Sequence, residues 1–95
     1  MPLDMSWEPK GQHTVITETG PLHLNIRRVL SSNIEWVGWP RVIHDRWMVV
    51  QFKDGSRYAY FGVSRQRVVA CAYAVSTGSY FQRKIRKTFR TMKLR

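Results

Sequence analysis

The stretch that decides the fold is Met48-Val49-Val50-Gln51-Phe52-Lys53-Asp54-Gly55-Ser56-Arg57-Tyr58-Ala59-Tyr60-Phe61. Two runs rich in β-branched and aromatic residues flank the pair Asp54-Gly55, and this arrangement predicts a β-hairpin. We expect its strands to cover about residues 46–53 and 56–61. The register of the hairpin then determines which side chains face the core.

The length of the hairpin loop sets that register. A three-residue loop, Lys53-Asp54-Gly55 with Gly55 in the left-handed conformation, gives one face that is entirely apolar or aromatic: Met48, Val50, Phe52, Tyr58 and Tyr60. A two-residue loop would mix polar and apolar side chains on both faces. Because an antiparallel sheet with one wet face separates the two kinds, we predict the three-residue loop, with both tyrosines turned toward the helices.

The chain before the hairpin supplies a further strand and an extension. Residues 34–39 are β-branched and aromatic and predict a strand, in which Gly38 indicates a bulge. Residues 1–28 form an N-terminal extension whose first twelve residues we expect to be mobile. Residues 13–19 alternate weakly and residues 22–26 more clearly; the two runs either pair through Gly20-Pro21 or lie as an extended arm on the domain.

After the hairpin the hydrophobic period changes to that of a helix. Ser64 suits an N-cap, and the apolar residues 68–75 predict a first helix that ends at residues 76–79. The spacing of Phe81, Ile85, Phe89 and Met92 predicts a second helix from about Ser79. We therefore expect an α+β domain at residues 29–95, with a three-stranded antiparallel meander followed by two α-helices.

Charge points to an anionic partner. The net charge is +10, and all six acids lie within residues 1–54, whereas residues 55–95 carry ten of the 16 Lys and Arg residues. Nucleic acid is the first expectation for such a balance and a membrane surface the second, while a merely solubilising surface is the alternative to an anionic partner. We predict that phosphate contacts come mainly from the polar face of the second helix. The predicted binding residues are Arg83, Arg86, Lys87, Arg90, Lys84, Lys93, Arg65, Arg67, Arg57 and Lys53.

The sheet face opposite the tyrosines is a second candidate surface. Trp47 and Phe61 would lie there with Lys53 and Arg57. Aromatic rings among cations stack unpaired bases, but the same rings could instead pack beneath the N-terminal arm. Both interpretations remain open.

Other chemistry has little support in the sequence. His44-Asp45 is an isolated pair in a connection, and Cys71, the only cysteine, lies in an apolar run. We therefore expect no catalytic residue, no metal ligand and no cofactor. The N-terminus lacks the pattern of a secretory signal and no apolar run is long enough to span a membrane, so a cytoplasmic location is the expectation.

Several spaced motifs resemble the KTSC domain, a small domain named for the C-terminus of some lysyl-tRNA synthetases and also found alone in bacteria and phages. They are Ser31-Ser32-Asn33-Ile34, Val37-Gly38-Trp39, Phe52-x-x-Gly55-x-x-Tyr58-x-Tyr60-Phe61-x-Val63, Ala74-x-Ser76-x-Gly78-x-Tyr80-Phe81, Ile85 and Phe89. The resemblance covers about residues 29–91. It implies a few strands followed by helices and no known catalytic residues, with RNA binding as the usual suggestion.

These observations predict a small non-enzymatic module that binds nucleic acid, with RNA or single strands favoured. The alternative, from another class, is a protein-interaction module or a small phage or bacterial regulator that binds an acidic partner protein. The sequence leaves the oligomeric state open.

Overall fold

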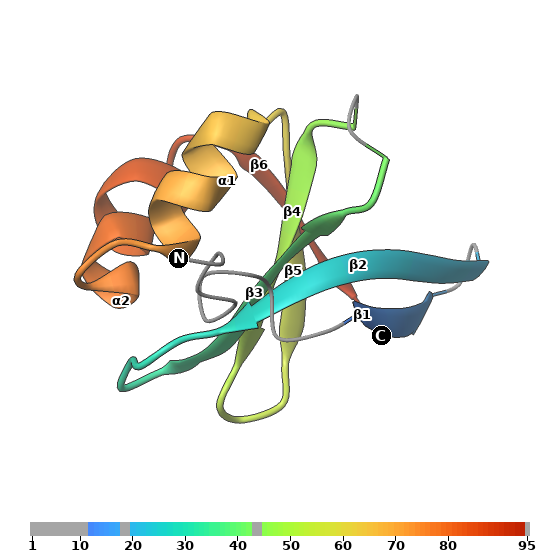
Figure 1. Cartoon of the computed structure of the whole chain (residues 1–95), viewed down its shortest axis with the longest axis horizontal. Coiled ribbons are helices and arrows are strands. Elements are labelled where there is room, and N and C mark those ends of the chain that lie inside the picture. Colours follow the sequence, from blue (N-terminus) through green and yellow to red (C-terminus); the bar gives the residue numbers. More distant parts are fainter. Residues whose placement is uncertain (1–11, 18–19, 43–44, 95) are drawn as a thin grey trace, which may run out of the picture.

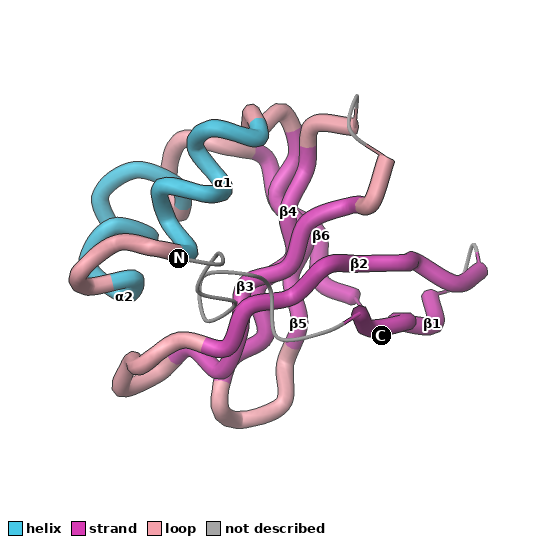
Figure 2. The backbone as a smooth tube through the Cα atoms, viewed as in Figure 1, coloured by secondary structure: helices cyan, strands magenta, loops and turns pink. Residues whose placement is uncertain are grey.

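Figure 1 shows a computed structural model of the chain, which describes residues 12–17, 20–42 and 45–94. Within them, six antiparallel strands form one sheet in chain order, and the helical segments cover one of its faces (Figures 1 and 2). The α+β class is confirmed, with a larger sheet than the predicted meander. The elements are β1 (Gln12–Thr17), β2 (Gly20–Arg28), β3 (Ile34–Pro40), β4 (Trp47–Phe52), β5 (Arg57–Phe61), α1 (Arg65–Ala72), α2 (Thr77–Tyr80), the π-helix η2 (Phe81–Ile85) and β6 (Arg90–Leu94).

The β4–β5 hairpin has the predicted register. Val50 lies opposite Tyr58, which leaves a loop of three residues, and Gly55 has a φ of +92°. The loop is closed by the Phe52 N–H, which donates to the Ser56 carbonyl at 2.9 Å. Hydrogen bonds from the Ser56 hydroxyl and backbone N–H to Asp54 lower the pKa of that carboxyl. A glycine is favoured at this φ because a side chain would be strained there.

The N-terminal extension forms the hairpin rather than a separate arm. β1 pairs with β2 with Ile16 opposite Pro21 and Thr17 opposite Gly20, so the predicted turn residues Gly20 and Pro21 lie within β2. β2 in turn pairs with β3, with Ile26 opposite Gly38. The sheet therefore includes part of residues 1–28. The predicted mobile tail lies outside the described residues, except for Gln12 at the start of β1.

The bulge in β3 lies at Glu35, and the prediction of a bulge at Gly38 was wrong. The pairing with β4 shifts by one residue between Ile34 and Trp36, which leaves Glu35 as the extra residue. Gly38 instead allows close packing, because a Cβ atom there would lie 2.9 Å from Cζ3 of Trp36. Both a bulge and a close approach favour glycine in a strand, so the sequence signal did not distinguish them.

The C-terminal part departs most from expectation. Ser64 caps α1 as predicted, since its Oγ accepts from the Arg67 N–H at 3.2 Å. Ser76 caps α2, which continues into the π turn of η2, where the Arg86 N–H donates to the Phe81 carbonyl at 3.0 Å. The chain then pairs with β5 as β6. Arg90 and Met92 therefore lie on a strand, and the prediction of one helix reaching Met92 was wrong.

Apolar clusters lie on both faces of the sheet. The larger one fills the space beneath the helices and includes Tyr60, Val68, Phe81 and Ile85. Tyr60 and half-buried Tyr58 both belong to this side, as predicted. The second cluster covers the centre of the opposite face, which is therefore not a continuous wet surface. Its buried members are Leu24, Ile26, Trp36, Val49, Ala59 and Leu94.

Candidate nucleic-acid interface

Four exposed cations form a compact group, the basic flank, on η2 and the turn after it: Arg83, Lys84, Arg86 and Lys87. Phe81 and Ile85 are at most 1% exposed and anchor this segment on the sheet. Side chains four residues apart point the same way on a helical turn, so Phe81 and Ile85 share the inward direction, and the four cations, two between these anchors and two after Ile85, are exposed. The two anchors thus hold the basic flank at the surface.

The arginines of the basic flank bond only to uncharged groups of their own segment in the contacts observed. Arg83 Nε lies 3.4 Å from the Ser79 hydroxyl, and an Arg86 Nη donates to the Gln82 side-chain oxygen at 3.0 Å. Each contact orients a guanidinium group without neutralising it. An arginine has five N–H donors, so such a contact still leaves donors for phosphate oxygens.

The basic flank lies close to the paired strands β5 and β6. Burial raises the pKa of the Tyr60 phenol, and a hydrogen bond with Thr91 and the charge of Arg86 oppose that rise. Thr91 lies directly opposite Tyr60, and its hydroxyl also donates to the Ala59 carbonyl at 3.0 Å. The Arg86 charge is therefore near enough to act on Tyr60, which lies on the helix side of β5.

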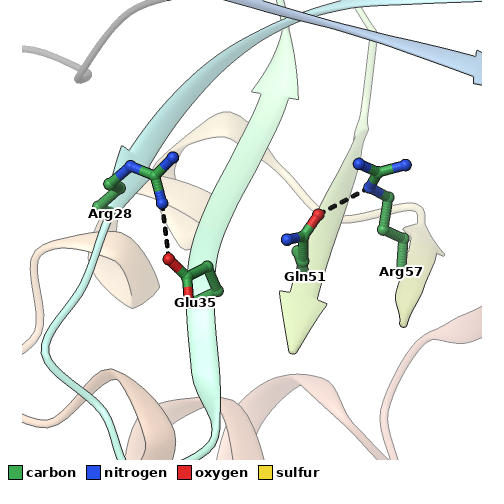
Figure 3. A network of polar contacts seen from close by, with 4 residues as sticks. All are labelled: Arg28, Glu35, Gln51 and Arg57. Carbon is green, nitrogen blue, oxygen red and sulfur yellow. Dashed lines mark hydrogen bonds and ion pairs between the residues drawn. The ribbon is translucent and has the colours of Figure 1, made fainter. Parts of the chain in front are cut away.

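Three other predicted residues lie near the β4–β5 loop, where acids accompany the cations. Exposed Lys53 is in the loop, and the charge of Lys93 on β6 helps to lower the pKa of Asp54, after the Ser56 hydrogen bonds. Arg57 donates to the Gln51 side chain at 2.7 Å (Figure 3). This end of the sheet is more balanced in charge than the basic flank.

Positive and negative charges are also more balanced on the neighbouring strands β2 and β3 than on the basic flank. Arg28 forms an ion pair with Glu35 at 2.6 Å, and Figure 3 shows this pair beside the Gln51–Arg57 contact. Both side chains of the ion pair are partly exposed, so the pair contributes little to stability. Its effect on binding is to offset one positive charge at this end.

The remaining three predicted residues lie at the opposite end of the sheet. An Arg65 Nη donates to the Pro40 carbonyl at 3.0 Å, and Arg67 lies with its guanidinium carbon 5.9 Å from the centre of the Phe89 ring. Arg90 lies over the Phe61 ring at 5.8 Å. The ten predicted residues therefore occupy three places, and Arg90 is separated from the basic flank by its position on β6.

The two rings expected on the opposite sheet face are also at that far end. Trp47 lies opposite Phe61, four residues along the strands from the Gln51–Arg57 pair. Both rings are half-buried against the second apolar cluster, which supports the packing interpretation for their inner surfaces. The four predicted members, Trp47, Phe61, Lys53 and Arg57, do not form one patch.

The residues set aside for other chemistry can be placed only in part. His44 lies outside the described residues, and Asp45 is exposed. Cys71 is buried, and burial raises the pKa of its thiol to about 12, which is unsuited to a nucleophile. Within residues 12–17, 20–42 and 45–94, no group of three or more His, Cys, Asp and Glu side chains is placed to hold a metal ion, and no helix could span a bilayer.

An antiparallel sheet in chain order, with short helices packed on one face by buried aromatic rings, defines a small α+β domain. The KTSC domain model matches residues 30–89, and the chain belongs to that family. The chain is also similar to a KTSC domain protein from Yersinia pestis, whose crystal structure superposes with a TM-score of 0.67. The two share 29% identity over 76% of this chain and 99% of that one. No curated protein matches the chain.

Proposed function

We propose that this chain is a small non-enzymatic module that binds nucleic acid, with RNA or single strands favoured over duplex DNA. The observation that carries the proposal is the basic flank, where four exposed cations lie within five consecutive residues. Residues 55–95 contain no acid in the sequence, so no carboxylate of that half offsets their charge. Such a group favours the phosphate backbone of a polynucleotide.

The anchoring of the basic flank supports this function. The Phe81 ring packs edge-on against Phe52 and Tyr60, with centroids 5.8 and 5.3 Å away. The backbone that carries the cations is thereby fixed, and less conformational entropy is lost on binding than for a mobile basic tail. A preformed array of this kind binds phosphates with a defined spacing rather than only through net charge.

Oligonucleotide titration tests the proposal. Labelled RNA, single-stranded DNA and duplex DNA would be titrated at several salt concentrations with the full chain and with the double variant Arg86→Gln/Lys87→Gln. Each lost phosphate contact lowers the salt slope by about 0.7 on single strands, so the double variant should lose about 1.4. The charge-matched control is Arg28→Gln/Lys53→Gln, which removes two cations from the more balanced region.

The control decides whether position or net charge matters. Equal losses in both double variants, or wild-type binding no tighter than that of a polylysine of equal charge, would contradict the proposal. The competing function is binding of an acidic protein by the same flank. That function would be favoured if the chain binds no oligonucleotide but one acidic protein co-purifies with it after nuclease treatment. The same acidic protein should then be lost from the Arg86→Gln/Lys87→Gln variant.

A further inference from the structure

Arginines gather at one end of the sheet, where β3 and β5 end and β4, β6 and α1 begin. This is the upper end in Figure 1, where the green β3–β4 connection, the yellow β5–α1 connection and the start of red β6 lie. Among the described residues the lysines lie elsewhere, in the basic flank, the β4–β5 loop and the far part of β6. We call this region the arginine end; its cations are Arg41, Arg46, Arg65, Arg67 and Arg90.

Aromatic rings lie between these arginines. Trp47 and Phe61 face each other across β4 and β5, and the Arg90 guanidinium lies over the Phe61 ring. Phe89 lies near Gly62, where a Cβ atom would be 3.8 Å from its ring, but on the helix side of the sheet, whereas Trp47 and Phe61 lie on the opposite side. All three rings are half-buried, so each keeps part of its surface accessible.

The backbone of the arginine end is held by bonds between its elements. The Gly62 N–H donates to the Arg46 carbonyl at 2.7 Å, which joins the end of β5 to the start of β4. The Arg65 side chain joins α1 to the end of β3 through the Pro40 carbonyl. The rings and guanidinium groups therefore project from a fixed frame formed by four elements.

We propose that the arginine end stacks unpaired bases of a single-stranded nucleic acid, while the basic flank holds its phosphates. This rests on the proposed nucleic-acid function and deepens it by assigning a second site and a ligand class. A planar guanidinium group can stack on a base as well as pair with a phosphate, whereas the ammonium group of a lysine pairs with phosphate but has no planar surface to stack. Bases of a duplex stack on one another and cannot reach a ring at the surface, so this arrangement favours unpaired bases.

The two parts are joined along the chain. Phe89 and Arg90 follow Lys87 by two and three residues, so the basic flank leads directly into the arginine end. The basic flank lies on the helix side of the sheet and Phe61 on the opposite side, so a strand whose phosphates lie on the basic flank would reach the Phe61 ring by passing over the arginine end at the start of β6. The arrangement therefore favours one continuous single strand over two separate ligands.

The test compares single strands with duplex on the full chain. Wild-type protein, Phe61→Leu and Phe61→Tyr would be titrated with labelled single-stranded RNA, single-stranded DNA and a blunt duplex of equal length. Losing one stacked base should weaken single-strand binding about 5-fold to 150-fold and leave duplex binding within about twofold. Phe61→Tyr, which keeps the ring, should keep the affinity.

A matched control and a second variant keep the result interpretable. The control is Tyr73→Leu, which removes a ring that also lies beneath an arginine: the Arg27 guanidinium carbon is 3.9 Å from the centre of the Tyr73 ring. Tyr73 lies at the C-terminal end of α1, away from the arginine end, so this variant should bind single strands as the wild type does. Arg90→Lys keeps the charge and loses the planar group, so it should weaken single-strand binding selectively even if Phe61→Leu does not fold.

The outcomes separate this inference from the proposed function. Wild-type protein that binds no oligonucleotide would overturn both. Wild-type binding in which Phe61→Leu and Arg90→Lys change single-strand and duplex affinity alike would overturn base stacking and leave the phosphate-binding function standing. Selective loss with RNA alone, or with RNA and DNA together, would support the inference and identify the source of the single strand.

Discussion

Truncating Phe81 tests how the helical segment is fixed to the sheet. Its ring is 1% exposed and makes edge-to-face contacts with Phe52 and Tyr60. Removing a buried ring costs about 3–5 kcal/mol through lost burial and the cavity left behind. Phe81→Leu retains most of the burial but loses the two ring pairs, worth about 0.5–1.5 kcal/mol each, so it should cost about 1–3 kcal/mol.

Urea denaturation followed by far-UV circular dichroism at neutral pH measures both losses. We expect the midpoint to fall for both variants, further for Phe81→Ala, with an unchanged m-value. Small domains have a free energy of unfolding of about 5–15 kcal/mol, so a loss of this size removes a large part of it. The Phe81→Ala variant should therefore be folded only at low urea concentrations. A loss below about 1 kcal/mol for Phe81→Ala would show that the segment is not anchored by this ring, and the argument for a preformed basic flank would fail with it.

Two further predictions concern other parts of the core. Because the Cys71 thiol has a pKa of about 12 when folded and the ordinary value is 9.0, the folded state holds its proton where the unfolded state loses it. Stability should therefore fall as the pH rises above about 9, by up to about 1.4 kcal/mol per pH unit, and Cys71→Ala should flatten this fall in urea melts at pH 8–10; equal slopes would contradict the assignment. Gly38→Ala should cost about 1–3 kcal/mol by overpacking against Trp36, measured by thermal melting, and a neutral effect would mean that the ring moves aside freely.

The centre of the fold was predictable because one local signal constrained many residues. The Asp54-Gly55 pair and the alternation around it determined the register, and the register assigned Tyr58 and Tyr60 to the helix side. The second apolar cluster was not predicted, because it needs Leu24 of β2 and Leu94 of β6 to come to the same face of the sheet. Those contacts depend on pairings between distant strands, which no short window of sequence contains.

The prediction of a second helix reaching Met92 was wrong for a similar reason, because it too depended on strand pairing that a short stretch of sequence does not show. Phe81, Ile85 and Phe89 do follow helical turns, since the Phe89 N–H donates to the Ile85 carbonyl at 3.2 Å. Beyond Phe89 the period becomes two, with Met92 and Leu94 as its only apolar members. No glycine or proline marks the change. The strand forms because β5 offers it an unpaired edge, a tertiary effect that outweighs local propensity.

That change of structure alters the functional interpretation of Arg90. On a continuous helix it would have joined Arg83, Arg86 and Lys87 as one more phosphate contact. On β6 it lies opposite Phe61, whose side chain faces away from the helices, and its guanidinium covers that ring. A cation over an aromatic ring can stack a base as well as hold a phosphate. The step from turn to strand thus separates Arg90 from the basic flank, and the proposed division into a phosphate-binding part and a stacking part depends on that separation. An altered salt slope should therefore follow substitution in the basic flank, and altered single-strand preference should follow substitution at Arg90.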